Sequence, residues 1–158
     1  MKVSDQDTDS IIDSVLSASR VLVAVAARSL SDVAEEVTLT QYRTLVVLAS
    51  RGPQHMAGLA DAVGVTPATA TRMCDRLVKK KLIVRRAVRG DRRQVRLVLS
   101  KSGLDLVTAV TNRRRKEIEK IIGAVPLEER GVLVQALGRF AAAAGEVPEQ
   151  DWSAGWDL

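Results

Sequence analysis

The sequence predicts a mainly α-helical chain with one small β-hairpin, on three observations. Apolar residues recur at helical spacing through most of the 158 residues. Two short runs rich in β-branched residues lie close together, at 83–88 and 94–99. Apolar residues make up 46% of the chain and aromatic residues only 3%, which predicts a core of Val, Leu, Ile and Ala. This length corresponds to a single domain, 1–158.

Residues 9–36 are expected to form one long helix. An apolar stripe at helical spacing runs along it, made of Ile12, Val15, Leu16, Leu22, Val23, Ala26, Leu30 and Val33. A single subunit of this size has too little surface to cover such a stripe, which suggests a second subunit.

The N-terminal residues argue against export. Asp5, Asp7 and Asp9 stand where a secretory signal would carry positive charge. No stretch approaches about 18 uninterrupted apolar residues, so we expect no membrane span. These features predict a cytoplasmic protein.

A second helix is expected from Thr38 through Ser50. Thr38 and Gln41 have the spacing of a capping box. Its core candidates are Leu45, Val46 and Leu48. Arg51-Gly52-Pro53 should end it.

The next two helices have the layout of a helix-turn-helix. A short helix from Met56 ends at Gly64, and a second runs over residues 66–80 with Thr66 as N-cap and Pro67 in the first helical position. One face of the second helix is apolar: Ala70, Met73, Cys74 and Leu77. The open face carries small, hydroxyl-bearing and charged residues: Ala68, Thr69, Thr71, Arg72, Asp75, Arg76 and Lys79. Such a face suits the major groove of DNA; the alternative is an ordinary amphipathic surface helix.

The runs 83–88 and 94–99 predict two strands joined by a loop over residues 89–93. Helix, turn, helix and hairpin together make a winged helix-turn-helix. The loop carries three arginines and one aspartate, an unusual choice for a purely structural turn: Arg89, Asp91, Arg92 and Arg93.

Two further helices should follow. Ser100 can cap a helix that runs to about Gly123, and the last helix should span Leu127 to Ala144 and use Leu133, Leu137 and Phe140. The basic run 113–116 could be interpreted as a second DNA contact. We instead expect Arg113 and Arg115 to pair with Glu117 and Glu119, four residues further on. Residues 145–158 form an acidic tail, either loose or docked through Trp152 and Trp156.

Positive charge is concentrated around the predicted helix-turn-helix. Residues 72–101 hold 12 of the 24 Lys and Arg residues but two of the 19 Asp and Glu residues. This segment therefore carries +10 and the rest of the chain −5. Such a distribution is typical of a phosphate-binding surface; the alternative is a solvated basic face without a partner.

The middle of the chain resembles the MarR family of bacterial transcriptional regulators, over residues 38–103. Residues 91–103, DRRQVRLVLSKSG, fit the family's D-R-R-x-x-x-L-x-L-[T/S]-x-x-G pattern, and residues 70–77, ATRMCDRL, fit its recognition-helix pattern. The chain departs from the family at Lys81, where glycine is usual, and at His55, where a Ser or Thr cap is usual. Neither position faces the expected DNA.

The resemblance implies a homodimeric, ligand-responsive repressor that binds a pseudo-palindromic site in double-stranded DNA. It assigns residues 9–36 and 100–144 to the helical dimerisation region and 38–99 to the DNA-binding lobe. The expected DNA-binding residues are Thr66, Pro67, Ala68, Thr69, Thr71, Arg72, Arg76, Arg89, Asp91, Arg92 and Arg93. Of these, Thr69, Thr71 and Arg72 would lie at or near base edges, Arg76 at phosphate and Arg93 in the minor groove, with Asp91 holding the arginine.

A small aromatic or anionic effector is also expected from the resemblance. Arg28, Tyr42 and Arg43 could supply a carboxylate anchor and an aromatic wall, although surface salt bridges explain the arginines equally well. A sequence-neutral architectural DNA-binding protein is the alternative function.

Catalysis has little support. His55 is the only histidine, which excludes multi-histidine zinc sites. It is expected to serve as a turn or cap residue, so Ser-His-Asp and Cys-His arrangements are not expected either. No phosphate-binding glycine loop occurs, and we expect no enzyme, cofactor or metal. Cys74 is either an oxidation sensor or a small buried hydrophobe; its place on the apolar face favours the second.

Overall fold

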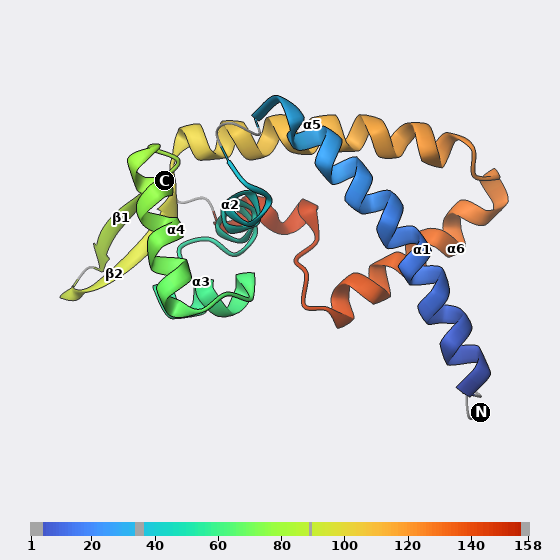
Figure 1. Ribbon diagram of the computed structural model, residues 1–158, viewed down its shortest axis with the longest axis horizontal. Helices are drawn as coiled ribbons and strands as arrows, with labels where there is room; N and C mark the ends of the chain where they lie inside the picture. Colours follow the sequence, from blue (N-terminus) through green and yellow to red (C-terminus); the bar gives the residue numbers. More distant parts are fainter. Residues whose placement is uncertain (1–4, 34–36, 89, 156–158) are drawn as a thin grey trace.

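The computed structural model describes residues 5–33, 37–88 and 90–155, and the side chains of residues 5, 91–93 and 153–155 lie outside that description (Figure 1). The chain is mainly helical with one two-stranded antiparallel hairpin, which confirms the predicted fold class. In chain order the elements are α1 (Asp5–Leu30), η1 (Ser31–Val33), α2 (Leu39–Arg51), α3 (Met56–Val63), α4 (Pro67–Lys79), β1 (Ile83–Val88), β2 (Asp91–Leu99), α5 (Lys101–Gly123), α6 (Leu127–Ala143) and η2 (Glu149–Gly155).

The hydrophobic core lies around α2, between the helix-turn-helix and α5. The capping box starts this helix as predicted, since Thr38 Oγ1 accepts from the Gln41 N–H at 3.2 Å and Gln41 Oε1 accepts from the Thr38 N–H at 3.1 Å. All three expected core residues of α2 are buried: Leu45, Val46 and Leu48. Leucine, isoleucine and valine side chains from α3, α4, both strands and α5 surround them.

The first helix is shorter at its C-terminal end than predicted. It ends at Leu30 and is followed by one 3-10 turn, whereas the sequence indicated a helix to residue 36. The Ser29 and Ser31 hydroxyls donate to the carbonyls of Ala26 and Arg28, at 2.9 and 2.8 Å. Such side-chain bonds compete with the backbone pattern of an α-helix, which explains the early end. Residues 34–36 lie outside the described residues.

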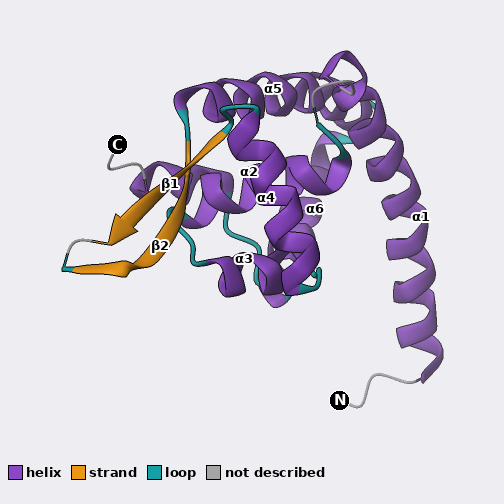
Figure 2. Ribbon diagram, turned by 60° about the vertical axis from the view of Figure 1, so that its left-hand side comes forward, coloured by secondary structure: helices purple, strands orange, loops and turns teal. Residues whose placement is uncertain are grey.

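The hairpin turn is tighter than predicted. Val88 pairs with Asp91, so the second strand starts at Asp91 and not at Gln94. Gly90 has φ 90°, a backbone conformation that a two-residue hairpin turn requires and that glycine adopts at no steric cost. The pairing is irregular between Ala87 and Val88, because Ala87 pairs with Val95. In Figure 2 the hairpin projects from the side of the molecule opposite α1.

The end of α4 is strained at Lys81. The Leu82 N–H donates to the Leu77 carbonyl and the Lys81 N–H to the Val78 carbonyl, a Schellman motif that places Lys81 in the left-handed region. Its φ is 61°, and it is the one non-glycine residue with positive φ in the described part of the chain. The departure from the family's glycine therefore appears as backbone strain.

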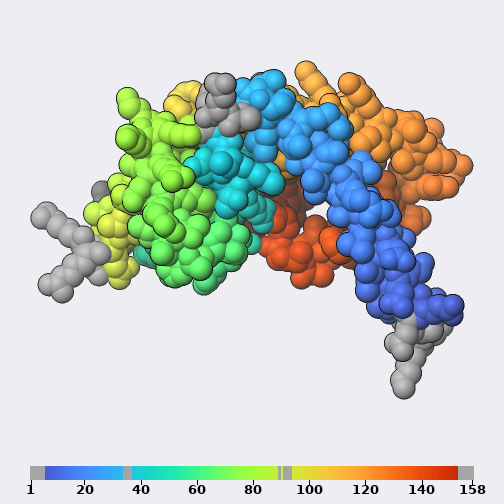
Figure 3. Space-filling view, in the orientation of Figure 1, coloured from blue at the N-terminus to red at the C-terminus, as the bar shows by residue number. Residues whose placement is uncertain are grey.

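Large apolar side chains remain exposed on α1 and α6. Figure 3 shows α1 as an arm that extends away from α3, α4 and the hairpin. More than two fifths of each of the following side chains is accessible: Ile11, Ile12, Leu16, Val21, Leu22, Val23, Leu127, Val132, Val134, Leu137 and Phe140. The predicted stripe on α1 and the predicted apolar residues of α6 are thus largely uncovered by the chain's own fold.

The same helix corrects the expectation that no segment could span a membrane. The helical segment Gln6–Val33 contains an 18-residue window with a mean hydropathy of 1.6, so by length and composition alone it could cross a bilayer. No uninterrupted apolar run marks this segment, because serines, Asp13 and Arg20 interrupt it without lowering the mean hydropathy below that of a possible span.

The basic run on α5 pairs with other elements rather than within its own helix. Arg113 lies 3.3 Å from Asp32 and Arg115 lies 3.0 Å from Glu149, while Glu117 pairs with Arg28 at 2.9 Å. The prediction of ion pairing was correct, but the predicted partners were wrong, because carboxylates from η1 and the tail reach these arginines.

At Gly103 the start of α5 lies close against the end of α4 and the base of the hairpin. A Cβ at this position would lie 2.1 Å from the Leu82 carbonyl oxygen and 2.7 Å from Leu99 Cδ1. We therefore expect Gly103→Ala to lower the free energy of unfolding by ~1–3 kcal/mol in urea titrations. Gly58→Ala is the matched control, since its Cβ would meet Gln54 Oε1 at an ordinary 3.5 Å; it should raise stability by ~0.5–1 kcal/mol. Equal effects would contradict the close contact.

Candidate nucleic-acid interface

Helix α4 starts as its sequence predicts. The Thr66 hydroxyl accepts from the Thr69 N–H at 3.3 Å, and Pro67 occupies the first helical position. Before it, Gly64 ends α3 in the left-handed conformation, with φ 74°. His55 caps α3 without a side-chain hydrogen bond, as its departure from the family pattern suggested.

The four predicted apolar residues of α4 are all buried: Ala70, Met73, Cys74 and Leu77. The Thr44 hydroxyl of α2 lies 3.3 Å from the Met73 sulfur, inside the core. This packing fixes the rotation of α4 about its axis and so decides which residues face solvent.

The opposite face of α4 is open. Its exposed residues are Pro67, Ala68, Thr71, Arg72, Asp75, Arg76 and Lys79, while Thr69 is half-buried. The Thr66 hydroxyl donates to the Thr69 hydroxyl, and the Thr71 hydroxyl donates to the Pro67 carbonyl. Arg72 and Arg76 make no hydrogen bond or ion pair with the described residues, so both guanidinium groups are available to phosphate or base edges.

A hollow of about 410 Å³ lies between α4 and the start of α2. Arg72 and Arg76 stand on one side, and Thr38 and Thr40 on the other. The N-terminus of a helix carries positive partial charge, so α2 adds to the positive potential that the two arginines create beside the recognition helix.

Asp75 is neutralised by the wing. Its carboxylate accepts from Arg85 of β1 at 2.5 Å. The pair ties the open face of α4 to the hairpin and removes the repulsion that an isolated carboxylate would exert on DNA. The sequence alone did not reveal this contact, although the presence of an aspartate among the basic residues of a predicted DNA-binding face could have indicated it.

The wing is only partly described. The backbone of residues 91–93 continues β2, and Gly90 forms the turn. Arg89 and the side chains of Asp91, Arg92 and Arg93 lie outside the described residues, so their expected roles stay predictions.

Comparison with known proteins decides the family. The sequence model of the MarR family matches residues 37–95. The structure of RV1404 from Mycobacterium tuberculosis is 42% identical, with a TM-score of 0.83 over 92% of this chain and 99% of that one. The HTH-type transcriptional repressor NicR from Pseudomonas putida is 31% identical over 105 residues, 66% of each protein. The chain belongs to the MarR family.

A more distant structure shares the same fold. The structure of BpsR from Bordetella bronchiseptica is 23% identical, with a TM-score of 0.59 over 80% of this chain and 89% of that one. That structure concerns how 6-hydroxynicotinic acid regulates the DNA binding of BpsR. In this MarR-family transcriptional regulator, α3, α4 and the hairpin form the winged helix.

The three expected effector residues contact different partners. Arg28 pairs with Glu117 of α5, and both side chains are partly exposed. Tyr42 is buried, with its hydroxyl 3.4 Å from Thr111 Oγ1 and the Arg114 guanidinium 5.5 Å from its ring centroid.

Arg43 forms a two-bond pair with Glu146 of the tail, at 3.0 and 2.7 Å. This hydrogen bonding raises the pKa of Arg43 and lowers the pKa of Glu146. The surface salt-bridge explanation thus accounts for the contacts that both arginines make in this structure.

Cys74 is buried on the core face of α4, as predicted. Desolvation raises the pKa of its thiol to about 11. At pH 8 about one thiol in a thousand is then ionised, and the thiolate is the reactive form. The position is that of a packed hydrophobe rather than a reactive sulfur.

We therefore expect Cys74 to resist a thiol-reactive disulfide reagent in the native protein at pH 8 and to react completely in guanidinium chloride. Release of the coloured thiolate measures both rates. Reaction of the native protein at the rate of the unfolded chain would contradict the burial of this residue.

Proposed function

We propose that this MarR-family regulator is a homodimeric repressor that binds a pseudo-palindromic operator and responds to a small aromatic or anionic effector. The observation that carries the proposal is the open face of α4, where Arg72 and Arg76 are exposed and unpaired within the described contacts. The repressor role is supported by NicR, a repressor by name.

The exposed apolar faces of α1 and α6 support a dimer. A second copy would bury the side chains that this chain leaves accessible. In a two-fold dimer, two copies of α4 would enter successive major grooves about one helical turn apart. This arrangement also accounts for the membrane-like hydropathy of α1, without a bilayer.

Within that arrangement we assign Thr69, Thr71 and Arg72 to base edges and Arg76 to phosphate. Thr66, Pro67 and Ala68 allow the start of α4 to approach the groove closely. Arg89, Arg92 and Arg93 add positive charge at the wing, with Arg93 in the minor groove, where A·T-rich narrowing strengthens the negative potential.

The effector response is supported by BpsR, whose DNA binding is regulated by an aromatic acid. We propose Arg43 and Arg28 as carboxylate anchors and Tyr42 as the aromatic wall. An effector acts if it favours a dimer whose recognition helices are wrongly spaced for DNA.

In vitro selection of duplexes bound by the purified protein tests the function. We expect enrichment of an inverted repeat with half-site centres about one helical turn apart. A pool without sequence preference would contradict the operator model and favour the architectural DNA-binding alternative.

Arg93→Ala should lower the affinity for the selected duplex by ~1–3 kcal/mol without unfolding the protein, because one arginine contact is lost. Asp91→Ala should weaken binding as well, although it removes a negative charge. Without Asp91 to hold it, the side chain of Arg93 would have to be ordered on binding. Fluorescence anisotropy measures both affinities. Tighter binding by Asp91→Ala would show that bulk electrostatics, and not orientation, sets the role of this residue.

A further inference from the structure

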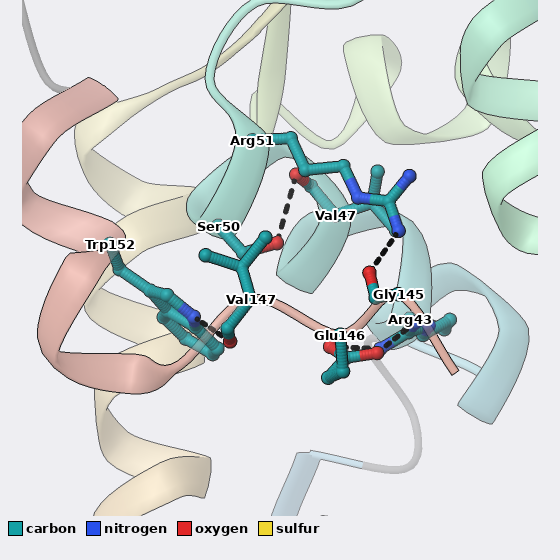
Figure 4. A network of polar contacts seen from close by, with 8 residues as sticks. All are labelled: Arg43, Val47, Ser50, Arg51, Gly145, Glu146, Val147 and Trp152. Carbon is teal, nitrogen blue, oxygen red and sulfur yellow. Dashed lines mark hydrogen bonds and ion pairs between the residues drawn. The ribbon is translucent and has the colours of Figure 1, made fainter. Parts of the chain in front are cut away.

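The chain after α6 folds back onto α2. We call residues 145–152 the strap. Arg51 Nη2 of α2 donates to the Gly145 carbonyl at 3.2 Å, and Arg43, two helical turns earlier, donates both its Nη atoms to the Glu146 carboxylate (Figure 4). Two arginines of one helix thus hold consecutive residues of the strap.

The far end of the strap rests on α5. Trp152 is half-buried against the core and donates its indole N–H to the Val147 carbonyl at 3.1 Å. Glu149 pairs with Arg115. A small cavity of about 90 Å³ remains beside Glu149 and Trp152, so this end is not packed as tightly as the core.

The Arg43–Glu146 pair has the geometry of carboxylate recognition. Two parallel N–H···O bonds match the guanidinium fork to one carboxylate. The side chains of Arg43 and Glu146 are 38% and 36% exposed, so a dissolved anion can reach the guanidinium once Glu146 moves away. Ion pairs with this exposure contribute little stability, so the Glu146 carboxylate can leave Arg43 at small cost.

We propose that Glu146 of the strap is an intramolecular competitor for the carboxylate of an anionic effector at Arg43. The inference rests on the effector response proposed above and adds the chain's own regulation of it. Because the strap is covalently attached, its carboxylate has a high effective concentration at Arg43. An effector binds only the fraction of molecules in which Arg43 is free, and its apparent Kd rises accordingly.

The test compares Glu146→Gln with wild type, using 4-hydroxybenzoate as the probe. Isothermal titration at constant salt should give an apparent Kd about tenfold lower for Glu146→Gln, the gain expected if the strap occupies Arg43 about nine tenths of the time. Asp151→Asn is the matched control, because it removes the same charge from an exposed strap residue that forms no ion pair with the described residues. It should bind the probe as wild type does.

Two further measurements make the result specific. The neutral analogue 4-hydroxybenzamide should show no gain with Glu146→Gln, and Arg43→Gln should abolish the binding of 4-hydroxybenzoate. In a Trp156→Phe background, the probe should shift the emission of Trp152 to longer wavelength as the strap leaves.

Equal probe affinities for wild type and Glu146→Gln would overturn the proposal. An equal gain with Asp151→Asn would also overturn it, since net charge would then be the cause. Failure of Glu146→Gln to bind the probe at all overturns it as well. Titration of the same preparations with the selected duplex tests DNA binding separately. A failure of the proposed competition at Arg43 can therefore be distinguished from a failure of the proposed DNA-binding function.

Discussion

The burial of one face of α4 in the common core is the constraint on which the DNA-binding lobe depends. Ala70, Cys74 and Leu77 are fully buried and Met73 is 7% exposed, so this short helix seats one complete face in the core. Burial of each large apolar side chain contributes ~1.5–3 kcal/mol. With the apolar face held in this way, the opposite face has no packing role and can carry Arg72 and Arg76 without structural cost.

A second junction links that helix to the rest of the molecule. The Ser100 hydroxyl donates to the Lys81 carbonyl at 2.7 Å and accepts from the Gly103 N–H at 3.0 Å. Gly103 itself lies against the Leu82 carbonyl. The end of α4, the base of the hairpin and the start of α5 are therefore joined by direct contacts. These contacts set the position of α5 relative to α4 and the hairpin.

Local signals in the sequence were sufficient for the DNA-binding lobe. The capping box at Thr38, the Thr66-Pro67 helix start and the glycine at residue 64 act on neighbouring residues, so each could be predicted without a structure. The apolar face of α4 followed from helical spacing alone. The two-residue hairpin turn was not predicted, because Asp91 has low strand propensity and residues 91–93 carry no β-branched side chain, and strand pairing overrode these local signals.

Contacts between distant segments could not be predicted in this way. The partners of Arg113, Arg115 and Arg43 lie in η1 and the tail, and only the folded chain brings them together. Docking of the tail through Trp152, one of two alternatives in the sequence, is confirmed, whereas Trp156 lies outside the described residues. Helical spacing likewise predicted the apolar residues of α1 and α6 but not that the fold of this chain would leave most of them exposed.

Hydroxyl-radical footprinting on a selected duplex tests the central claim most directly, namely that two copies of α4 and the wing read the DNA together. The account predicts two protected segments whose centres lie about one helical turn, ~10 base pairs, apart, each flanked by protection in the adjacent minor groove. A single protected segment, or uniform protection along the duplex, would contradict it.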